Sequence, residues 1–258
     1  MRKVRSMETL QVAIENRDGH TLRGIVTVPA PEGAFPCVVM LHGFGGSASG
    51  YKYFNTYLAR HLAREGIACV RFDFYGCGES DGEFSDMLFD GLLGDAADIF
   101  AWASAQPWAD EGHMFLAGHS MGGYVAASSA PSIGPHGLIL LSPGAAMWRD
   151  AERNACMLEQ HTGRDYADME GLVYKMAFNH NMGAHPDPYV EAAGYDGPVL
   201  IARAADDKLV SDEDCERYQA IYQRASYVQT SAGGHDFANL EARAAVFDAV
   251  TEFVKSHS

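Results

Sequence analysis

Short runs of apolar residues alternate along the chain with longer segments that are suited to helices. The apolar runs predict buried strands at 37–41, 67–72, 113–117, 137–141, 199–202 and 226–230. The segments between them predict helices at 53–65, 91–105, 121–130, 212–222 and 240–255. Strands that alternate with helices are typical of a mainly parallel sheet with helices on both faces. We therefore expect an α/β fold.

The start of the chain follows a different pattern. Segments 10–15 and 21–28 each alternate apolar and polar residues, and Asn-Arg-Asp-Gly-His at 16–20 separates them. Alternation on both sides of an Asp-Gly turn predicts an antiparallel hairpin at the start of the sheet.

The stretch from 146 to 193 interrupts the alternation of strands and helices. It is too long for a simple loop and is rich in Met, His, Tyr and Asn. We predict a small cap over the C-terminal ends of the strands, where such sheets bind their ligands. The chain then consists of one core, 1–145 and 194–258, with a cap insertion at 146–193.

The sequence Gly-His-Ser-Met-Gly at 118–122 lies between a predicted strand and a run of small residues suited to a helix. In a tight strand-to-helix turn, glycine is needed two positions before and two positions after the central serine. The helix that follows directs its N-terminal amides at an anion formed beside the serine oxygen. The pattern predicts a nucleophile elbow with Ser120 as the nucleophile.

A serine nucleophile needs a base, and the chain offers eleven histidines. His235 alone combines a glycine-rich loop, a preceding strand and a position near the C-terminus, so it is the predicted base. His119, the variable residue of the elbow, is predicted to pack beside the site.

Two adjacent carboxylates, Asp206 and Asp207, follow the predicted strand at 199–202 and could orient the base. We favour Asp207 because the apolar residues Leu209 and Val210 would anchor the turn beyond it. Asp206 is then a loop carboxylate, and Asp236, next to the histidine, is predicted to be solvated or to fix its loop.

An oxyanion hole is expected where the strand at 37–41 ends in His-Gly-Phe-Gly-Gly at 42–46. Glycines at this point let a backbone amide turn towards a developing alkoxide. The predicted donors are the amides of Phe44 and Met121.

The composition and net charge of the chain limit the kinds of molecule that it is expected to bind. The chain has 258 residues with 47% hydrophobic and 21% charged residues, as in globular proteins. With 19 basic and 34 acidic residues its net charge is −15, which argues against nucleic acid and anionic membranes as partners. There is no apolar signal core and no run long enough to span a membrane.

Five cysteines, an odd number, favour reduced thiols and a cytoplasmic location. No Cys-x-x-Cys or His-Glu-x-x-His pattern occurs, so we predict no metal and no cofactor. A homodimer is the expected assembly.

These motifs resemble the α/β-hydrolase family, and within it the bacterial cinnamoyl and feruloyl esterases. Further carriers of the resemblance are Arg-Phe-Asp-Phe-Tyr-Gly-Cys-Gly-Glu-Ser-Asp-Gly at 71–82 and Asp-Asp-Lys-Leu-Val-Ser at 206–211. The resemblance implies the α/β-hydrolase fold and a catalytic triad of Ser120, Asp207 and His235, with its typical 28-residue spacing between acid and base.

The resemblance also implies that a cap aspartate and a cap tyrosine bind the phenolic hydroxyl of a hydroxycinnamoyl group. They map to Asp150 and Tyr174, with Tyr166 and Tyr189 as alternatives to the tyrosine. Asp150 could instead cap a helix, and Tyr174 could instead pack in the fold.

The predicted function is a serine carboxylesterase that hydrolyses small-molecule esters, in particular hydroxycinnamate esters, through an acyl-enzyme. The alternatives with the same fold are a thioesterase, an acylglycerol lipase and a small-peptide hydrolase, the last of which would need an anchor for the substrate amine that the sequence does not show. An alternative of another class is a ligand-binding protein on an inactive hydrolase scaffold, which the complete set of catalytic residues disfavours.

Overall fold

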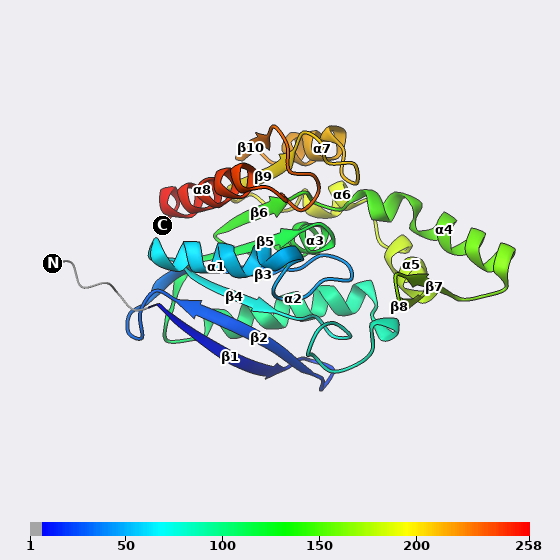
Figure 1. Cartoon of the computed structure of the whole chain (residues 1–258), viewed down its shortest axis with the longest axis horizontal. Helices are drawn as coiled ribbons and strands as arrows, with labels where there is room; N and C mark the ends of the chain where they lie inside the picture. Colours follow the sequence, from blue (N-terminus) through cyan, green and yellow to red (C-terminus); the bar gives the residue numbers. More distant parts are fainter. Residues whose placement is uncertain (1–6) are drawn as a thin grey trace.

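One eight-stranded sheet forms the centre of the structure, a computed structural model that describes residues 7–258. Its strands are β1 (Glu8–Glu15), β2 (Thr21–Val28), β3 (Phe35–Leu41), β4 (Ala68–Phe72), β5 (Ala109–His119), β6 (Gly137–Leu141), β9 (Val199–Ala204) and β10 (Ala225–Thr230). They lie in the order β1-β2-β4-β3-β5-β6-β9-β10 (Figure 1). The order reverses at β3, so β4 and β5 lie on either side of it.

The pairing of the strands confirms the predicted sheet. β1 pairs antiparallel with β2, from Glu8 opposite Val28 to Glu15 opposite Thr21, and β2 pairs antiparallel with β4. All pairs from β4 to β10 are parallel. Every residue of β4, β6 and β9 is buried, because helices cover both faces of the sheet.

Two layers of helices enclose the sheet. The sheet separates the hydrophobic core into two clusters, one under each layer. The helices are α1 (Phe54–Arg64), α2 (Phe89–Ser104), α3 (Met121–Ile133), α7 (Asp212–Ile221) and α8 (Leu240–Ser256). α1 and α8 pack on one face, and α2, α3 and α7 pack on the other (Figure 1). Each helix predicted from the sequence is present, with ends within three residues of those expected.

The segment between β6 and β9 contains the region predicted as a cap. Its elements are α4 (Ala146–Thr162), β7 (Tyr166–Met169), β8 (Leu172–Lys175), α5 (Met176–Gly183) and α6 (Pro188–Ala192). α4 and the β7–β8 hairpin project from the body of the molecule, on the right of Figure 1. α6 instead packs on α3 and α7.

Hydrogen bonds tie the projecting segment to the N-terminal end of α2. The backbone N–H of Asp90 donates to Oδ1 of Asn181 at 2.9 Å, and Nδ2 of Asn181 donates to Oδ2 of Asp90 at 2.7 Å. Nε2 of His185 lies 2.9 Å from Oδ1 of Asp90. These bonds fix α5 to the N-terminal end of α2.

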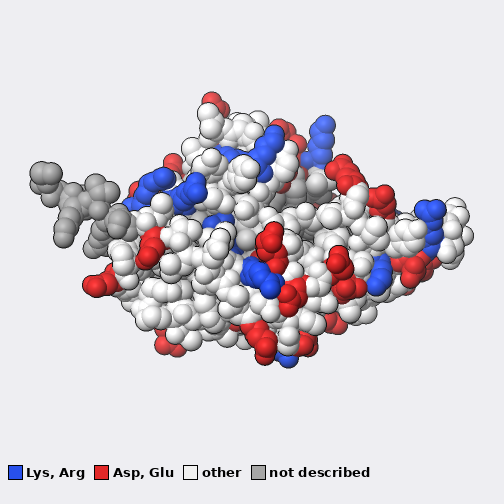
Figure 2. All heavy atoms as spheres, turned by 60° about the horizontal axis from the view of Figure 1, so that its bottom comes forward, with Lys and Arg blue, Asp and Glu red and all other residues white. Residues whose placement is uncertain are grey.

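The surface carries its excess of acidic side chains in a dispersed form. On the face shown in Figure 2, Asp and Glu are spread widely, and Lys and Arg occur in small groups without a continuous basic patch. Within residues 7–258 no helix has both the length and the apolar character needed to cross a membrane.

Candidate active site

Ser120 lies in the sharp turn between β5 and α3, where its backbone has φ 55° and ψ −122°. Few residues other than glycine adopt such a φ, at a cost of about 1–3 kcal/mol. The neighbouring glycines permit the turn: a Cβ at Gly118 would overlap the carbonyl oxygen of Gly122, and one at Gly122 would lie 2.5 Å from that of His42. The serine is thus held in strained backbone at the C-terminal end of a central strand, as the elbow motif predicts.

Asp207 and His235 come from the loops after β9 and β10. Nδ1 of His235 lies 2.9 Å from Oδ2 of Asp207, and the Asp207 side chain is fully buried. Burial acts to raise the pKa of Asp207. Hydrogen bonds from His235 and from the amides of Leu209 and Val210 outweigh burial and lower this pKa to about 2. The ionised carboxylate therefore accepts a hydrogen bond from the N–H at Nδ1, which leaves Nε2 of His235 free to act as a base.

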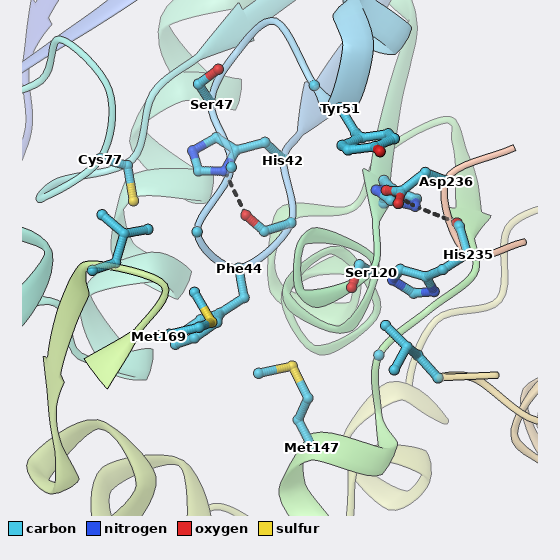
Figure 3. Close-up of a pocket in the computed structure, with 18 of the residues that line it drawn as sticks. His42, Phe44, Ser47, Tyr51, Cys77, Ser120, Met147, Met169, His235 and Asp236 are labelled. Atoms are coloured by element: carbon cyan, nitrogen blue, oxygen red, sulfur yellow. Dashed lines mark hydrogen bonds and ion pairs between the residues drawn. The ribbon is translucent and has the colours of Figure 1, made fainter. Parts of the chain in front are cut away.

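Ser120 and His235 line one cavity of about 950 Å³. In Figure 3 the imidazole of His235 lies beside the Ser120 hydroxyl. The three residues singled out from the sequence are therefore brought together at the edge of the sheet where its parallel strands end. This is the place at which α/β sheets bind ligands.

The two amides predicted as oxyanion donors are both available. Within residues 7–258, neither the N–H of Phe44 nor that of Met121 donates a hydrogen bond to another group. Met121 is the first residue of α3, so its N–H lies at the positive end of the helix. An oxyanion on the Ser120 side of the cavity would meet unpaired donors.

His42 fixes the loop that carries the Phe44 amide, a role that the sequence analysis missed. Its Nε2 accepts a hydrogen bond from the N–H of Phe74 at 3.1 Å, so Nδ1 carries the proton and donates to the carbonyl oxygen of Gly43 at 2.8 Å. The N–H of Gly46 donates to the same oxygen at 3.1 Å. Because the C=O and N–H of a trans peptide point in opposite directions, this arrangement orients the Phe44 N–H away from His42. Burial lowers the pKa of His42, which keeps the ring neutral.

His119 lies behind His235. Its Nε2 donates to the backbone carbonyl oxygen of His235 at 2.9 Å, and the two ring centroids are 5.0 Å apart. Burial, with a contribution from the charge of His235, lowers the pKa of His119 to about 4. A neutral His119 therefore supports the backbone of the loop that carries His235.

The cavity has an apolar half beneath the projecting segment. Its walls there include Phe44 and Phe84 from the core and Met147, Met169 and Leu172 from the segment. Figure 3 shows Phe44, Met147 and Met169 together on one side of Ser120. Met147, Met169 and Leu172 were not among the predicted site residues, because an isolated methionine or leucine carries no chemical signature.

Asp150 also lines the cavity, next to Met147 and Asn154 of α4. It does not cap a helix, since the N-cap of α4 is Ala145 and Asp150 lies within the helix. Oδ1 of Asp150 forms an ion pair of 2.6 Å with Nη2 of Arg153, one turn further along α4.

Tyr174 is not among the residues that line the cavity. Its ring packs edge-to-face on Phe44, with centroids 5.2 Å apart, so it supports the cavity wall from behind. The alternative tyrosines are not in the wall either: Tyr189 donates to Oδ1 of Asp214 at 3.1 Å, and Tyr166 lies exposed on β7. A role for a cap tyrosine in binding substrate therefore has no support from its position.

No cluster of His, Cys, Asp or Glu within residues 7–258 has the arrangement of a metal site. Cys77 lines the cavity, but burial raises the pKa of its thiol to about 12.

A comparison with known protein families shows to which family the chain belongs. Residues 34–170, just over half of the chain, match the family described as serine aminopeptidase, S33. The chain belongs to this family. The match covers β3 to β7, including the oxyanion loop and the elbow with Ser120.

Solved structures agree with this placement at the level of the fold. The structure of Est1E from Butyrivibrio proteoclasticus with ferulic acid bound superposes with a TM-score of 0.85 at 24% identity, covering 95% of this chain and 98% of that one. The predicted α/β-hydrolase fold is confirmed, and the likeness to Est1E is a likeness of fold.

Curated relatives match over a shorter region. The quorum-quenching protein AidA of Acinetobacter baumannii (strain MDR-ZJ06) is 33% identical over 104 residues, which is 40% of this chain and 33% of AidA. An uncharacterised 31.7 kDa protein of Escherichia coli is 31% identical over 100 residues, which is 38% of this chain and 34% of that protein. The alignments span about a third of the length of these relatives.

Proposed function

We propose that this hydrolase is a serine carboxylesterase that works through an acyl-enzyme. The observation that carries the proposal is the 2.9 Å pairing of His235 with buried Asp207, beside a serine held in a strained turn. An imidazole that is oriented by a carboxylate and has its Nε2 free beside a serine hydroxyl is the arrangement needed to activate that hydroxyl.

In the first step His235 takes the proton of Ser120 while Oγ attacks the ester carbonyl carbon. The carbonyl oxygen becomes an oxyanion that the amides of Phe44 and Met121 stabilise. Collapse of this intermediate breaks the ester bond, and His235 gives its proton to the leaving alcohol. Water then attacks the acyl-enzyme with His235 again as base, which releases the acid and restores Ser120.

The acyl group is proposed to be aromatic, with hydroxycinnamate as the leading candidate. The apolar half of the cavity offers Phe44, Met147 and Met169, which suit a flat apolar group. Asp150 in its wall could accept a hydrogen bond from a phenolic hydroxyl. The binding of ferulic acid to Est1E, which shares the fold, supports this choice.

Ester hydrolysis is favoured over peptide hydrolysis by the charges in this half. An aminopeptidase binds the free ammonium group of the acyl residue, which calls for an available carboxylate. Asp150 is the carboxylate at this position, and Arg153 already pairs with it at 2.6 Å.

Two measurements test the proposal. Wild-type protein should hydrolyse p-nitrophenyl esters and become labelled by a fluorophosphonate, and Ser120→Ala should lose both properties while keeping its thermal unfolding transition. An unlabelled wild-type protein would instead favour a ligand-binding protein on an inactive scaffold. Full activity in Ser120→Ala would exclude the acyl-enzyme.

A further inference from the structure

The half of the cavity opposite the cap segment has a polar wall made by Tyr51, Asn55 and Asp236. Figure 3 shows Tyr51 and Asp236 on the other side of Ser120 from Met147 and Met169. Tyr51, Asn55 and Asp236 have no role in the proposed ester hydrolysis.

Two polar side chains of this wall lack partners. Asn55 is only 2% exposed, and its amide forms no hydrogen bond within residues 7–258. The carboxylate of Asp236 likewise accepts no hydrogen bond from the described part of the chain, and Nε2 of His119 lies 3.9 Å from its Oδ1. Buried polar groups are normally satisfied, so the unpaired amide of Asn55, which faces the cavity beside the half-buried carboxylate of Asp236, indicates a ligand with polar groups of its own.

The negative charge of Asp236 is not neutralised by His119. The pKa of His119 is lowered to about 4, chiefly by burial, so its ring is uncharged at neutral pH. The wall beside His235 therefore presents the carboxylate of Asp236 without a charged partner in the described part of the chain.

The turn that presents Tyr51 is rigidly built. Lys52 and Tyr53 have positive φ angles of 43° and 63°, a strained conformation for residues other than glycine. The guanidinium of Arg243 donates to the carbonyl oxygens of Tyr51 and Lys52 at 3.4 and 3.3 Å, and to that of Phe237 at 3.3 Å. Arg243 thus joins this turn to the loop that carries the catalytic histidine.

The mechanism decides which part of an ester meets this wall. His235 must reach the leaving oxygen to protonate it, so the alcohol lies on the histidine's side of Ser120. Asp236 follows His235 in the sequence and lines the same side. The acyl group then occupies the opposite, apolar half.

We propose that Tyr51, Asn55 and Asp236 form an alcohol subsite that selects neutral alcohols carrying additional hydroxyl groups and rejects anionic leaving groups. The inference rests on the proposed ester hydrolysis. A hydroxyl can donate to the carboxylate of Asp236, and it can both donate to and accept from the amide of Asn55. An anionic alcohol would be repelled by Asp236 and by a chain of net charge −15.

A neutral alcohol fits better than a cationic one because of Lys52. Its Nζ lies over the ring of Tyr51, 5.2 Å from the centroid. An alcohol with a quaternary ammonium group would compete for this aromatic face and would meet the lysine charge. Hydroxyl groups meet neither obstacle.

The test uses four esters of one aromatic acid that differ in the alcohol: methyl, 2,3-dihydroxypropyl, carboxymethyl and choline esters. For the wild type, kcat/KM for the dihydroxypropyl ester should exceed that for the methyl ester by about tenfold, as expected for a hydrogen bond to a charged acceptor. The carboxymethyl ester should fall below the methyl ester by a similar factor. Each result is expressed as a ratio to the methyl ester of the same variant, which cancels general effects on turnover.

In Asp236→Asn the dihydroxypropyl ratio should fall towards one and the carboxymethyl ratio should rise. Tyr51→Phe, a change at a half-exposed side chain, should lower the dihydroxypropyl ratio without raising the carboxymethyl ratio. Asp196→Asn is the matched control, because Asp196 is an exposed aspartate before β9, at the opposite end of the strands. It should retain the ratios of the wild type.

Three outcomes overturn the proposal. Equal rates for all four alcohols, or ratios that Asp236→Asn leaves unaltered, would show that the wall does not select the alcohol. A preference for the choline ester would identify a cation site instead. No turnover of any ester, the methyl ester included, would refute the proposed function, whereas methyl ester turnover without selectivity refutes the subsite alone.

Discussion

Asp206 and Asp207 are neighbours in the sequence, yet they hold different parts of the same catalytic loop. The carboxylate of Asp207 pairs with the imidazole of His235 at 2.9 Å, and that of Asp206 accepts a hydrogen bond from the N–H of Gly234 at 2.7 Å. Asp207 orients the side chain of His235, and Asp206 fixes the backbone just before it.

The two aspartates should therefore differ in their effect on catalysis. In Asp207→Asn we expect kcat on p-nitrophenyl esters to fall by about 10⁴-fold, because the amide favours the wrong tautomer of His235. In Asp206→Asn an amide oxygen can still accept from Gly234, so we expect a loss of less than about tenfold. Steady-state kinetics of both variants make the comparison, and equal losses would contradict the assignment of the acid.

The neutral state of His119 should appear in the dependence of stability on pH. An unfolded histidine titrates near 6.5, while the pKa of His119 in the folded protein is lowered to about 4. Between these values the unfolded chain binds a proton that the folded one does not, so stability is complete above about pH 6.5 and decreases as the pH falls towards 4. The shift corresponds to about 3 kcal/mol.

Replacement of His119 by Gln should remove most of this pH-dependent term. Gln can keep the hydrogen bond to the His235 carbonyl oxygen but does not titrate. Urea unfolding at pH 7 and at pH 4.5 should show a decrease in the free energy of unfolding that is about 2 to 3 kcal/mol smaller in His119→Gln than in the wild type. The lowered pKa of His42 acts in the same direction in both proteins, so it cancels in the comparison. Identical decreases would mean that His119 is not held neutral.

His42 should act on the transition state rather than on substrate binding. Its hydrogen bond to the carbonyl oxygen of Gly43 orients the Phe44 amide, and loss of one oxyanion donor costs about 3 kcal/mol, or 10²–10³ in kcat. His42→Asn should therefore lower kcat strongly while KM changes little. His113→Asn, in the part of β5 far from Ser120, is the control and should keep both constants. A rise in KM with kcat intact would contradict this role.

Much of the fold could be predicted from local sequence, because strands covered on both faces are continuous apolar runs. β6 has the predicted bounds, and the elbow is identified by glycines that its close backbone contacts require. The positioning contacts of His42, His119 and Arg243 could not be predicted. They join elements between one and about two hundred residues apart, and the sequence contains no pattern for such pairs.

The cap segment was the least predictable part for a related reason. The packing of α4 and of a short hairpin decides which of its side chains face the cavity. No periodic pattern in the sequence indicates which side of these elements that is. Tyr174 thus packs behind Phe44, while Met169 and Leu172, closer to the tip of the hairpin, line the cavity.

The triad roles, the cytoplasmic location and the homodimer stay predictions.

Asp150 and Tyr174 can be separated by their effect on phenolic substrates. Asp150 lines the cavity and Tyr174 does not, so only Asp150 is expected to bind the phenolic hydroxyl of a hydroxycinnamate. Wild-type protein should prefer methyl ferulate over methyl cinnamate, which lacks that hydroxyl, by a few-fold to about tenfold in kcat/KM. In Asp150→Asn the ratio should fall towards one, because the neutral amide is a weaker acceptor and the partner Arg153 is left unpaired.

Tyr174→Phe is the matched control, since it removes only a hydroxyl and preserves the ring that packs on Phe44. Its ferulate-to-cinnamate ratio should equal that of the wild type. Loss of the preference in Tyr174→Phe, with the ratio intact in Asp150→Asn, would mean that the hairpin moves to bring the tyrosine into the cavity when substrate binds. The static position of Tyr174 behind Phe44 argues against that movement, because a hydroxyl that is reached only after repacking two aromatic rings gives weak discrimination.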